Sequence, residues 1–168
     1  MLKKEGRPLK KTEKTNAVRY LEQMGIPFIL HSFTTVQACS ALKVAQILGQ
    51  DVQTVFKTLV TDGKTGTHYV FIVPAAQELD LKKAAISVCE KSVEMLKAKD
   101  LFPLTGYVHG GCSPIGMKKF FKTVVDESAR LQKTIFVSGG RIGLQIEIGI
   151  DELAMAIPLS FACLCKSV

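Results

Sequence analysis

The stretch TVFKTLVTDGKTGTHYVFIVP, residues 54–74, contains the two most strand-like segments of the chain. Branched and aromatic residues are enriched in TVFKTLV (54–60) and in THYVFIVP (67–74), and neither segment is interrupted by glycine. The segment DGKTG (62–66) between them has the composition of a tight turn. We therefore predict an antiparallel β-hairpin here, and we build the rest of the fold outward from it.

Lys57 is the unusual residue of this hairpin. Side chains alternate between the two faces of a strand, so Lys57 shares a face with the apolar residues Val55 and Leu59. A structural interpretation is that the long apolar stem carries the charge to water, or that the lysine protects a sheet edge. A functional interpretation is that Lys57 lines a pocket floored by Val55 and Leu59, where its charge would bind a phosphate or a carboxylate. The hairpin alone does not distinguish between these two interpretations of Lys57.

The remaining segments predict a chain of short helices and strands. A helix should begin with Thr15 as N-cap and end at Gly25, and a second should run from Ser40 to Leu48 before Gly49. A third should begin at Asp80. We also expect strands in 27–33, 120–126, 134–137 and 143–148, a short strand and helix within 92–104, one or two helical turns in 126–131 and a last helix at 151–156.

This order of elements favours an α+β fold. Strands outnumber helices, and a second hairpin is predicted around SGGR (138–141). Strict alternation of strands and helices is missing, which argues against a doubly wound sheet. We therefore expect a curved mixed sheet, at least partly antiparallel and flanked by helices.

Length and composition predict one domain, residues 15–168, behind a basic leader of residues 1–14. The 168 residues are enough for one proper core, and 47% hydrophobic with 22% charged residues is ordinary for a globular protein. No apolar run approaches the roughly 20 residues that cross a bilayer. The N-terminal region lacks the apolar segment of a signal peptide, so we expect a cytoplasmic protein without a membrane partner.

The charge of the chain points to a polyanionic partner. Its net charge is +7, and the leader alone holds six basic against two acidic residues, leaving +3 for the remainder. A basic arm on a mildly basic domain fits nucleic acid, although a solubilising leader explains the same charges.

The cysteines and histidines predict neither disulfides nor a metal site. The five cysteines are odd in number and form no CxxC pair, which is typical of reduced thiols. His31, His68 and His109 show no ligand spacing. We expect no cofactor.

Two glycine-rich stretches are candidates for binding a ligand. In GYVHGGCSPIGMKKF (106–120), Gly110 and Gly111 permit close approach to backbone N–H groups, and lysines follow Pro114. In VSGGRIGLQIEIG (137–149), the Ser138 hydroxyl and the amides of Gly139 and Gly140 could bond a ligand. Structural turns would explain both stretches equally well.

Familiar enzyme motifs are missing from the sequence. It has no GxSxG elbow, no P-loop, no HExxH and no clear dinucleotide fingerprint. His109 and Cys112 could be paired on paper, but no third residue orients the base. Any catalysis must therefore work without an obvious nucleophile of the enzyme.

Taken together, these stretches resemble the YbaK/EbsC family of aminoacyl-tRNA deacylases, which is similar to the editing domain inserted in bacterial prolyl-tRNA synthetases. The resemblance runs from about Thr15 to Ala156 and keeps the order and spacing of the motifs. The matching stretches are IPFILHSF (26–33), VFKTLV (55–60), LDLKKAA (79–85), TGYVHGGCSPIGMKK (105–119) and VSGGRIGLQIEI (137–148).

The resemblance implies a strongly curved, largely antiparallel mixed sheet and a pocket for the aminoacylated 3′ end of a tRNA. Members of the family remove wrongly attached amino acids, notably cysteine from proline tRNA. The lysine of the family's F-K-T motif falls on Lys57, its Gly-Gly-x-x-Pro loop on Gly110, Gly111 and Pro114, and its Ser-Gly-Gly turn on Ser138, Gly139 and Gly140.

The chain departs from the family at Phe33, where members similar to cysteinyl-tRNA deacylase carry an aromatic hydroxyl, and Gln145 falls on a variable pocket-edge position. The resemblance implies catalysis by Lys57, with the other motif residues, Phe33 and Gln145 binding substrate. The expected activity is removal of cysteine from Cys-tRNA(Pro) in trans, assisted by the substrate thiol, with prolyl-tRNA synthetase as a candidate partner. A non-catalytic module that binds a tRNA end or nucleotide, and a hydrolase of alanyl esters, are the alternatives.

Overall fold

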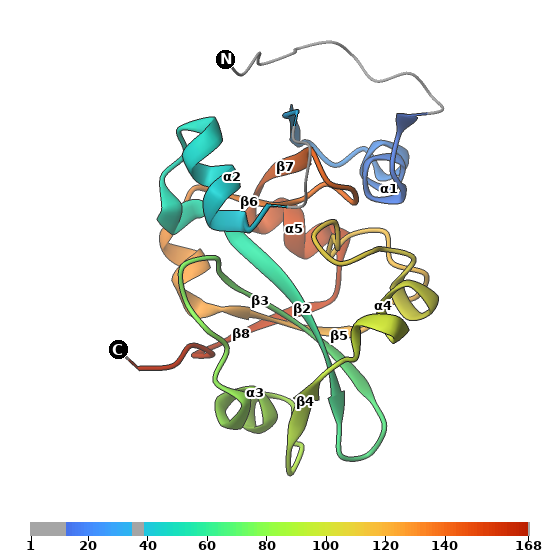
Figure 1. Cartoon of the computed structure of the whole chain (residues 1–168), viewed down its shortest axis with the longest axis vertical. Coiled ribbons are helices and arrows are strands. Elements are labelled where there is room, and N and C mark those ends of the chain that lie inside the picture. The colour runs from blue at the N-terminus through green and yellow to red at the C-terminus, as the bar shows by residue number, and fades with distance from the viewer. Residues whose placement is uncertain (1–12, 35–38, 168) are drawn as a thin grey trace.

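The computed structural model describes residues 13–34 and 39–167, which form five α-helices, eight β-strands and two short 3-10 helices (Figure 1). The predicted leader lies outside the described residues except for Glu13 and Lys14, whose ammonium pairs with Glu22 at 2.7 Å. The α-helices are α1 (Asn16–Met24), α2 (Ala41–Leu48), α3 (Leu81–Ser87), α4 (Ala98–Thr105) and α5 (Ile150–Ala156). The 3-10 helices are η2 (Val52–Thr54) and η3 (Glu127–Leu131). The strands are β1 (Ile29–Ser32), β2 (Phe56–Gly63), β3 (His68–Pro74), β4 (Val93–Met95), β5 (Lys122–Asp126), β6 (Thr134–Ser138), β7 (Leu144–Gly149) and β8 (Leu159–Ala162).

The strands form two sheets, which confirms the mixed α+β class. One sheet has the order β1-β7-β6 and is antiparallel throughout, and the other has the order β4-β2-β3-β5-β8. Both predicted hairpins are present, β2 with β3 and β6 with β7. Parallel pairs join β3 to β5 and β5 to β8. Figure 1 shows the two sheets in different parts of the molecule, with β6 and β7 above β2, β3 and β5.

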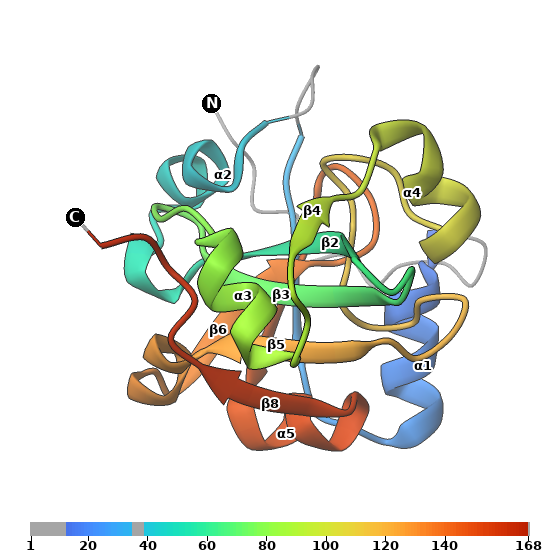
Figure 2. The same cartoon turned by 90° about the horizontal axis from the view of Figure 1, so that it is seen from below.

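Within the described residues, one isolated β-bridge connects the two sheets. Val55, just before β2, pairs in parallel with Phe136 of β6. The alternate face of β2 carries Phe56 and Val60 into the main core, where they meet residues from β3, β6, β7 and α1. The opposite face of the five-stranded sheet packs under α3, where Phe71 and Val73 meet Ala84 and Ala85 (Figure 2).

The helix termini agree with the capping residues read from the sequence. The Thr15 hydroxyl accepts from the N–H of Val18, the Ser40 hydroxyl from that of Lys43, and the Asp80 carboxylate from those of Lys82 and Lys83. Side-chain caps satisfy N–H groups that have no partner within the helix, which is why short helices begin at these residues. Gly25 and Gly49 end α1 and α2 in the left-handed conformation.

Two features differ from the sequence-based expectation. The first strand of the hairpin begins at Phe56, not Thr54, because an Asp51 carboxylate oxygen accepts from the N–H of Gln53 and holds 52–54 as a 3-10 turn. Strand β8 lies near the C-terminal end and was not predicted, since its partner, β5, precedes it by more than thirty residues in the chain. No helix in the described part of the chain is long and apolar enough to cross a membrane.

Candidate active site

A cavity of about 520 Å³ opens between the two sheets and is the candidate active site. Its walls come from β2, the start of α2, the segment from Met95 to Leu101, the loop around Gly110 and the β6–β7 hairpin. The size is that of a site for a small organic group, and most of the lining is apolar with a few polar side chains. The lining residues that the structure describes include no carboxylate.

The cavity meets strand β2 at its edge rather than on one face. Six consecutive residues, from Val55 to Val60, contribute to the lining, although alternate side chains of a strand point to opposite sides. Lys57 lies opposite Val73 and Thr58 opposite Ile72 in the β2–β3 ladder, so these neighbours reach the cavity from opposite sides of the sheet. Val55 and Leu59 also line it, as expected from the sequence.

Lys57 lies in this exposed edge and is half-buried. Within the described residues its ammonium makes no hydrogen bond or ion pair. Its charge contributes to the lowered pKa of Glu78, of which the hydrogen bond from Lys166 is the main cause. The Lys57 charge is therefore available to an anionic ligand without breaking an internal contact.

The two glycines of the first loop have different structural roles. Gly110 lines the cavity with a φ of +84°, a conformation that favours glycine. Gly111 does not line it; a Cβ there would lie 2.9 Å from the Cα of Arg141, so Gly111 lets the loop approach the β6–β7 hairpin. The Gly111 N–H is already donated to the carbonyl of Val108 at 3.0 Å, whereas the Gly110 N–H makes no such bond to the backbone of any described residue.

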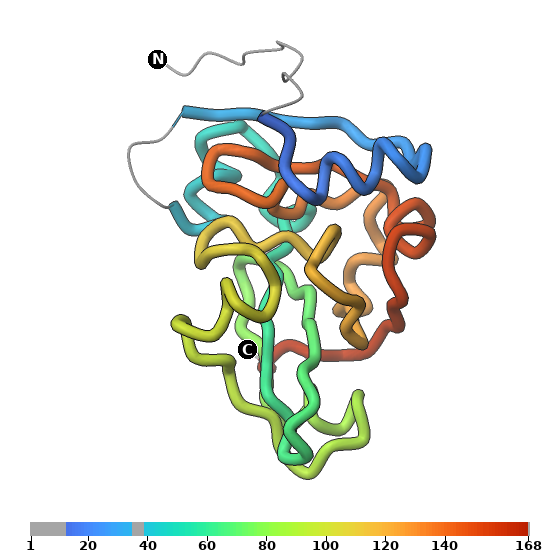
Figure 3. Tube along the Cα trace, turned by 90° about the vertical axis from the view of Figure 1, so that its right-hand side faces the viewer, coloured from blue at the N-terminus to red at the C-terminus, as the bar shows by residue number. Residues whose placement is uncertain are grey.

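The residues of the Ser-Gly-Gly turn also differ in their positions relative to the cavity. Ser138 lines the cavity, and its hydroxyl accepts a hydrogen bond from the N–H of Gly140. Gly139 and Gly140 are not part of the lining, and the hydroxyl of Thr15, the N-cap of α1, donates to the Gly139 carbonyl at 2.6 Å. Figure 3 shows the β6–β7 hairpin beside α1. Pro114 is also outside the cavity and lines a small separate cleft with Tyr20 and Phe120.

We expect Gly140→Ala to destabilise the fold by about 2 kcal/mol, because the residue combines a φ of +101° with a Cβ position 2.8 Å from the Tyr107 ring. Gly66→Ala is the matched control, since its φ of +84° is similar but nothing lies within 4 Å of the added carbon. Urea unfolding should show the larger loss for Gly140→Ala. Equal losses would mean that the contact with Tyr107 does not constrain the turn.

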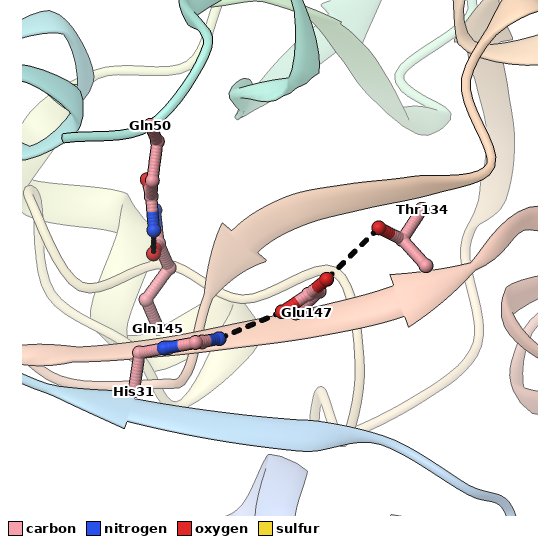
Figure 4. A network of polar contacts seen from close by, with 5 residues as sticks. All are labelled: His31, Gln50, Thr134, Gln145 and Glu147. Carbon is pink, nitrogen blue, oxygen red and sulfur yellow. Dashed lines mark hydrogen bonds and ion pairs between the residues drawn. The ribbon is translucent and has the colours of Figure 1, made fainter. Parts of the chain in front are cut away.

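Phe33 and Gln145 both line the cavity. The Phe33 N–H donates to the carbonyl of Gly143 at 2.9 Å, which fixes the ring beside the β6–β7 hairpin. Gln145 is almost fully buried, and its amide is paired with that of Gln50: Gln50 Nε2 donates to Gln145 Oε1 at 2.6 Å, and Gln145 Nε2 donates back to Gln50 Oε1 at 3.1 Å (Figure 4). The pair ties the residue after α2 to the cavity wall.

A second polar group lies on the same face of the three-stranded sheet. His31 Nε2 is 2.8 Å from a Glu147 carboxylate oxygen, and the Thr134 hydroxyl donates to the other oxygen at 3.0 Å (Figure 4). These residues come from β1, β7 and β6, and none of them lines the cavity. These contacts link the three strands of the sheet that carries Ser138 and Gln145.

Two thiols, those of Cys39 and Cys112, line the cavity. Burial raises the pKa of Cys112 to about 12, so at neutral pH it is a protonated thiol rather than a reactive thiolate. His109 lines the cavity near it but makes no hydrogen bond with it in the described structure. The described residues contain no cluster of three or more histidines, cysteines or acidic side chains that could hold a metal ion, and the five cysteines form no disulfide there.

Arg141 and Thr58 are among the lining residues that were not predicted site residues. Arg141 is exposed at the cavity and adds a second cation to Lys57. Its position directly after the Ser-Gly-Gly turn was the available signal. Thr58 also lines the cavity, with a buried hydroxyl that lacks a hydrogen-bond partner, and its place directly after Lys57 in the F-K-T motif was the available signal.

The comparison with known protein families agrees with this geometry. A sequence model described as "Aminoacyl-tRNA editing domain" matches residues 35–155. The chain belongs to this family. The match spans the cavity residues from β2, the Gly110 loop and the β6–β7 hairpin, so the resemblance to aminoacyl-tRNA deacylases seen in the sequence is confirmed.

Individual relatives place the chain among editing proteins. It is 48% identical over 146 residues to an Enterococcus faecalis protein assigned as the Cys-tRNA(Pro)/Cys-tRNA(Cys) deacylase EbsC, covering 86% of this chain and 89% of the relative. It is 27% identical over 119 residues to a Proline--tRNA ligase of Thermosipho melanesiensis, covering 67% of this chain but 21% of the ligase. A crystal structure assigned as a trans-editing enzyme for prolyl tRNA synthetase shares the fold, with a TM-score of 0.81, 24% identity, and coverage of 90% of this chain and 96% of the other.

Proposed function

We propose that this editing-domain protein acts in trans, in the cytoplasm, to remove cysteine from Cys-tRNA(Pro), and that the cysteinyl thiol is the nucleophile. The observation that carries the proposal is the chemistry of the cavity lining. Its described residues offer no carboxylate, and of its two thiols, those of Cys39 and Cys112, burial raises the pKa of Cys112 to about 12. The Ser138 hydroxyl accepts a hydrogen bond from the Gly140 N–H and has no histidine partner among the described residues. We infer that the attacking group comes from the substrate or from water.

The proposed reaction is an attack within the substrate. The cysteinyl sulfur, as thiolate, forms a bond to its own carbonyl carbon, and the ester C–O bond breaks. The terminal ribose oxygen leaves and takes up a proton from water, and the cysteine departs as a cyclic thioester that water later opens. Holding the two reacting atoms together can supply roughly 7–11 kcal/mol of the barrier, so the pocket needs only to orient them.

The cavity offers groups suited to the charges of this reaction. Lys57 and Arg141 can hold the phosphate of the terminal adenosine as charge-assisted partners. The Gly110 N–H, which bonds no described backbone group, can stabilise the developing oxyanion, whereas that of Gly111 is already occupied. We propose that tRNA(Pro) and prolyl-tRNA synthetase are the partners, because the chain is similar to part of Proline--tRNA ligase sequences.

The test is release of labelled amino acid from tRNA(Pro) charged with cysteine, serine or alanine. Serine matches cysteine in shape but lacks the thiol, so we expect the cysteinyl ester to be cleaved at least about 100-fold faster than the seryl ester. The cysteinyl rate should rise with pH as the substrate thiol ionises.

The other outcomes point to the other functions. Similar rates for all three esters would show attack by water and overturn the thiol mechanism. Rapid loss of the alanyl ester alone would indicate an alanyl editing enzyme. Saturable binding without cleavage of any ester would indicate a module that binds the tRNA end.

A further inference from the structure

Strand β2 has a gap in its pairing where the cavity lies. At one end, the edge that faces away from β3 is next to β6, through the bridge of Val55 and Phe136. At the other end, the same edge pairs with β4 from Thr61 to Gly63, and the carbonyl of Val60 accepts from the N–H of Leu96. Between these two contacts, no strand of the described chain covers residues 57–59 on this side.

The hydrogen-bond register shows which backbone groups face the gap. The Val55 carbonyl accepts from the N–H of Ala75, so the backbone of Val55 faces β3. Backbone groups of an antiparallel strand alternate between its two edges. Those of Lys57 and Leu59 therefore also face β3, and those of Thr58 face the cavity, in agreement with the outward carbonyl of Val60.

Thr58 also carries an unused side-chain group at this position. Its Oγ1 is inaccessible to water and has no hydrogen-bond partner, while other atoms of the residue line the cavity. Such a buried hydroxyl is unfavourable in the free protein. Threonine commonly occupies more than one χ1 rotamer, and rotation about χ1 exchanges its hydroxyl and methyl positions, so the hydroxyl can turn toward a ligand.

We propose that Thr58 is a substrate-binding residue whose hydroxyl accepts a hydrogen bond from the amino group of the aminoacyl ester, with the main chain of the substrate aligned along the unpaired edge of β2. This inference rests on the proposed deacylation. An aminoacyl ester offers an amine donor and a carbonyl acceptor in sequence, as a peptide does when it adds to a sheet edge. The described lining provides no carboxylate for the amine, so a neutral oxygen must receive it.

The experiment compares wild type, Thr58→Val and Thr58→Ser on Cys-tRNA(Pro) and on its N-acetylated form. Val keeps the shape without the hydroxyl, and Ser keeps the hydroxyl. Thr61→Val is the matched control, because Thr61 lies on the same strand outside the cavity, and its hydroxyl donates to the Tyr69 carbonyl at 3.3 Å. The readouts are kcat/KM for release of cysteine and the melting temperature.

We expect Thr58→Val to lower kcat/KM about tenfold on the free-amine substrate, and N-acetylation to cost wild type a similar factor. In Thr58→Val, N-acetylation should cost less than about twofold, since the partner of the amine is already gone. Thr58→Ser should stay near wild type. Thr58→Val should melt no earlier than wild type, because it removes a hydroxyl that has no partner.

Three results would overturn the assignment: a Thr58→Val variant with wild-type kcat/KM, an N-acetylation penalty that is equal in wild type and variant, or a loss of activity that Thr61→Val matches. Failure of the proposed deacylation itself would be recognised separately, because wild-type protein would then release no cysteine.

Discussion

Replacing Lys57 by alanine should reduce release of cysteine from Cys-tRNA(Pro) about 100-fold, because the contact to the terminal phosphate that positions the ester is lost. Lys57 is half-buried at the unpaired edge of β2 and lines the cavity. Arg141 is the other strong cation in the described lining, but it is exposed on a turn and less well positioned to hold a phosphate. Single-turnover cleavage with excess protein measures the effect.

The fold of this variant should be intact, because the Lys57 ammonium makes no hydrogen bond or ion pair with any residue that the structure describes. Lys57→Met separates charge from packing, since it keeps most of the apolar stem. It should be as inactive as Lys57→Ala and should melt like wild type. Lys64→Ala, in the exposed turn after β2, is the control for net charge. Unchanged cleavage by Lys57→Ala would contradict the role given to this lysine.

Asp126→Asn should cost about 2–4 kcal/mol of folding stability, because Asp126 anchors the C-terminal segment from inside the core. The residue is 5% exposed. One carboxylate oxygen accepts from the N–H of Ser128 at 3.1 Å, and the other accepts from the N–H of Leu164 at 3.0 Å and from the Cys165 thiol at 3.4 Å. In Asp126→Asn, the amide oxygen can replace one of the two accepting carboxylate oxygens. The NH₂ group takes the place of the other oxygen and there faces a hydrogen-bond donor.

The effect should depend on pH in a defined direction. Burial alone would raise the pKa of Asp126, but the nearby Ser128 hydroxyl and the N–H groups of Leu164 and Ser128 outweigh it and lower the pKa. A lowered pKa stabilises the fold above the unfolded value of about 3.9, and this stability is lost as pH falls through the folded value. The difference in free energy of unfolding between wild type and Asp126→Asn should therefore be constant near neutrality and become smaller below about pH 4.

Thermal unfolding across this range measures the difference. A loss of about 3 kcal/mol corresponds to roughly 6–12 °C in a chain of this size. Glu127→Gln, the exposed neighbour, should change the melting temperature little at any pH. If the difference in melting temperature between wild type and Asp126→Asn stayed unchanged well below pH 4, the loss of stability would come from packing rather than from the ionised carboxylate.

The sequence predicted the local structure well because local interactions determine it. Thr15, Ser40 and Asp80 each satisfy N–H groups two or three residues away, so each helix start can be recognised from its own neighbourhood. The β2–β3 hairpin follows from two strand-like segments and the turn between them. Strand β8 was missed, because four residues of LSFA become a strand only by pairing with β5.

Only some of the predicted site residues line the cavity. The structure brings Lys57, Phe33, Gly110, Ser138 and Gln145 to one cavity, and leaves Gly111, Pro114, Gly139 and Gly140 outside its lining. Glycine is compatible both with binding a ligand at the backbone and with close packing of two chain segments, so a glycine motif does not distinguish them. Here Gly111 packs against the backbone of Arg141, and Gly140 against the Tyr107 ring.

The sequence by itself determined the α+β class, the two hairpins and the helix caps, since each depends on residues that are near one another in the chain. Only the tertiary structure decided that the cavity meets β2 at an unpaired edge, that Gln50 occupies the amide of Gln145, and that the hydroxyl of Thr58 has no partner. These facts depend on where β6 and β4 contact β2, and such contacts between distant segments are set by the packing of the whole core.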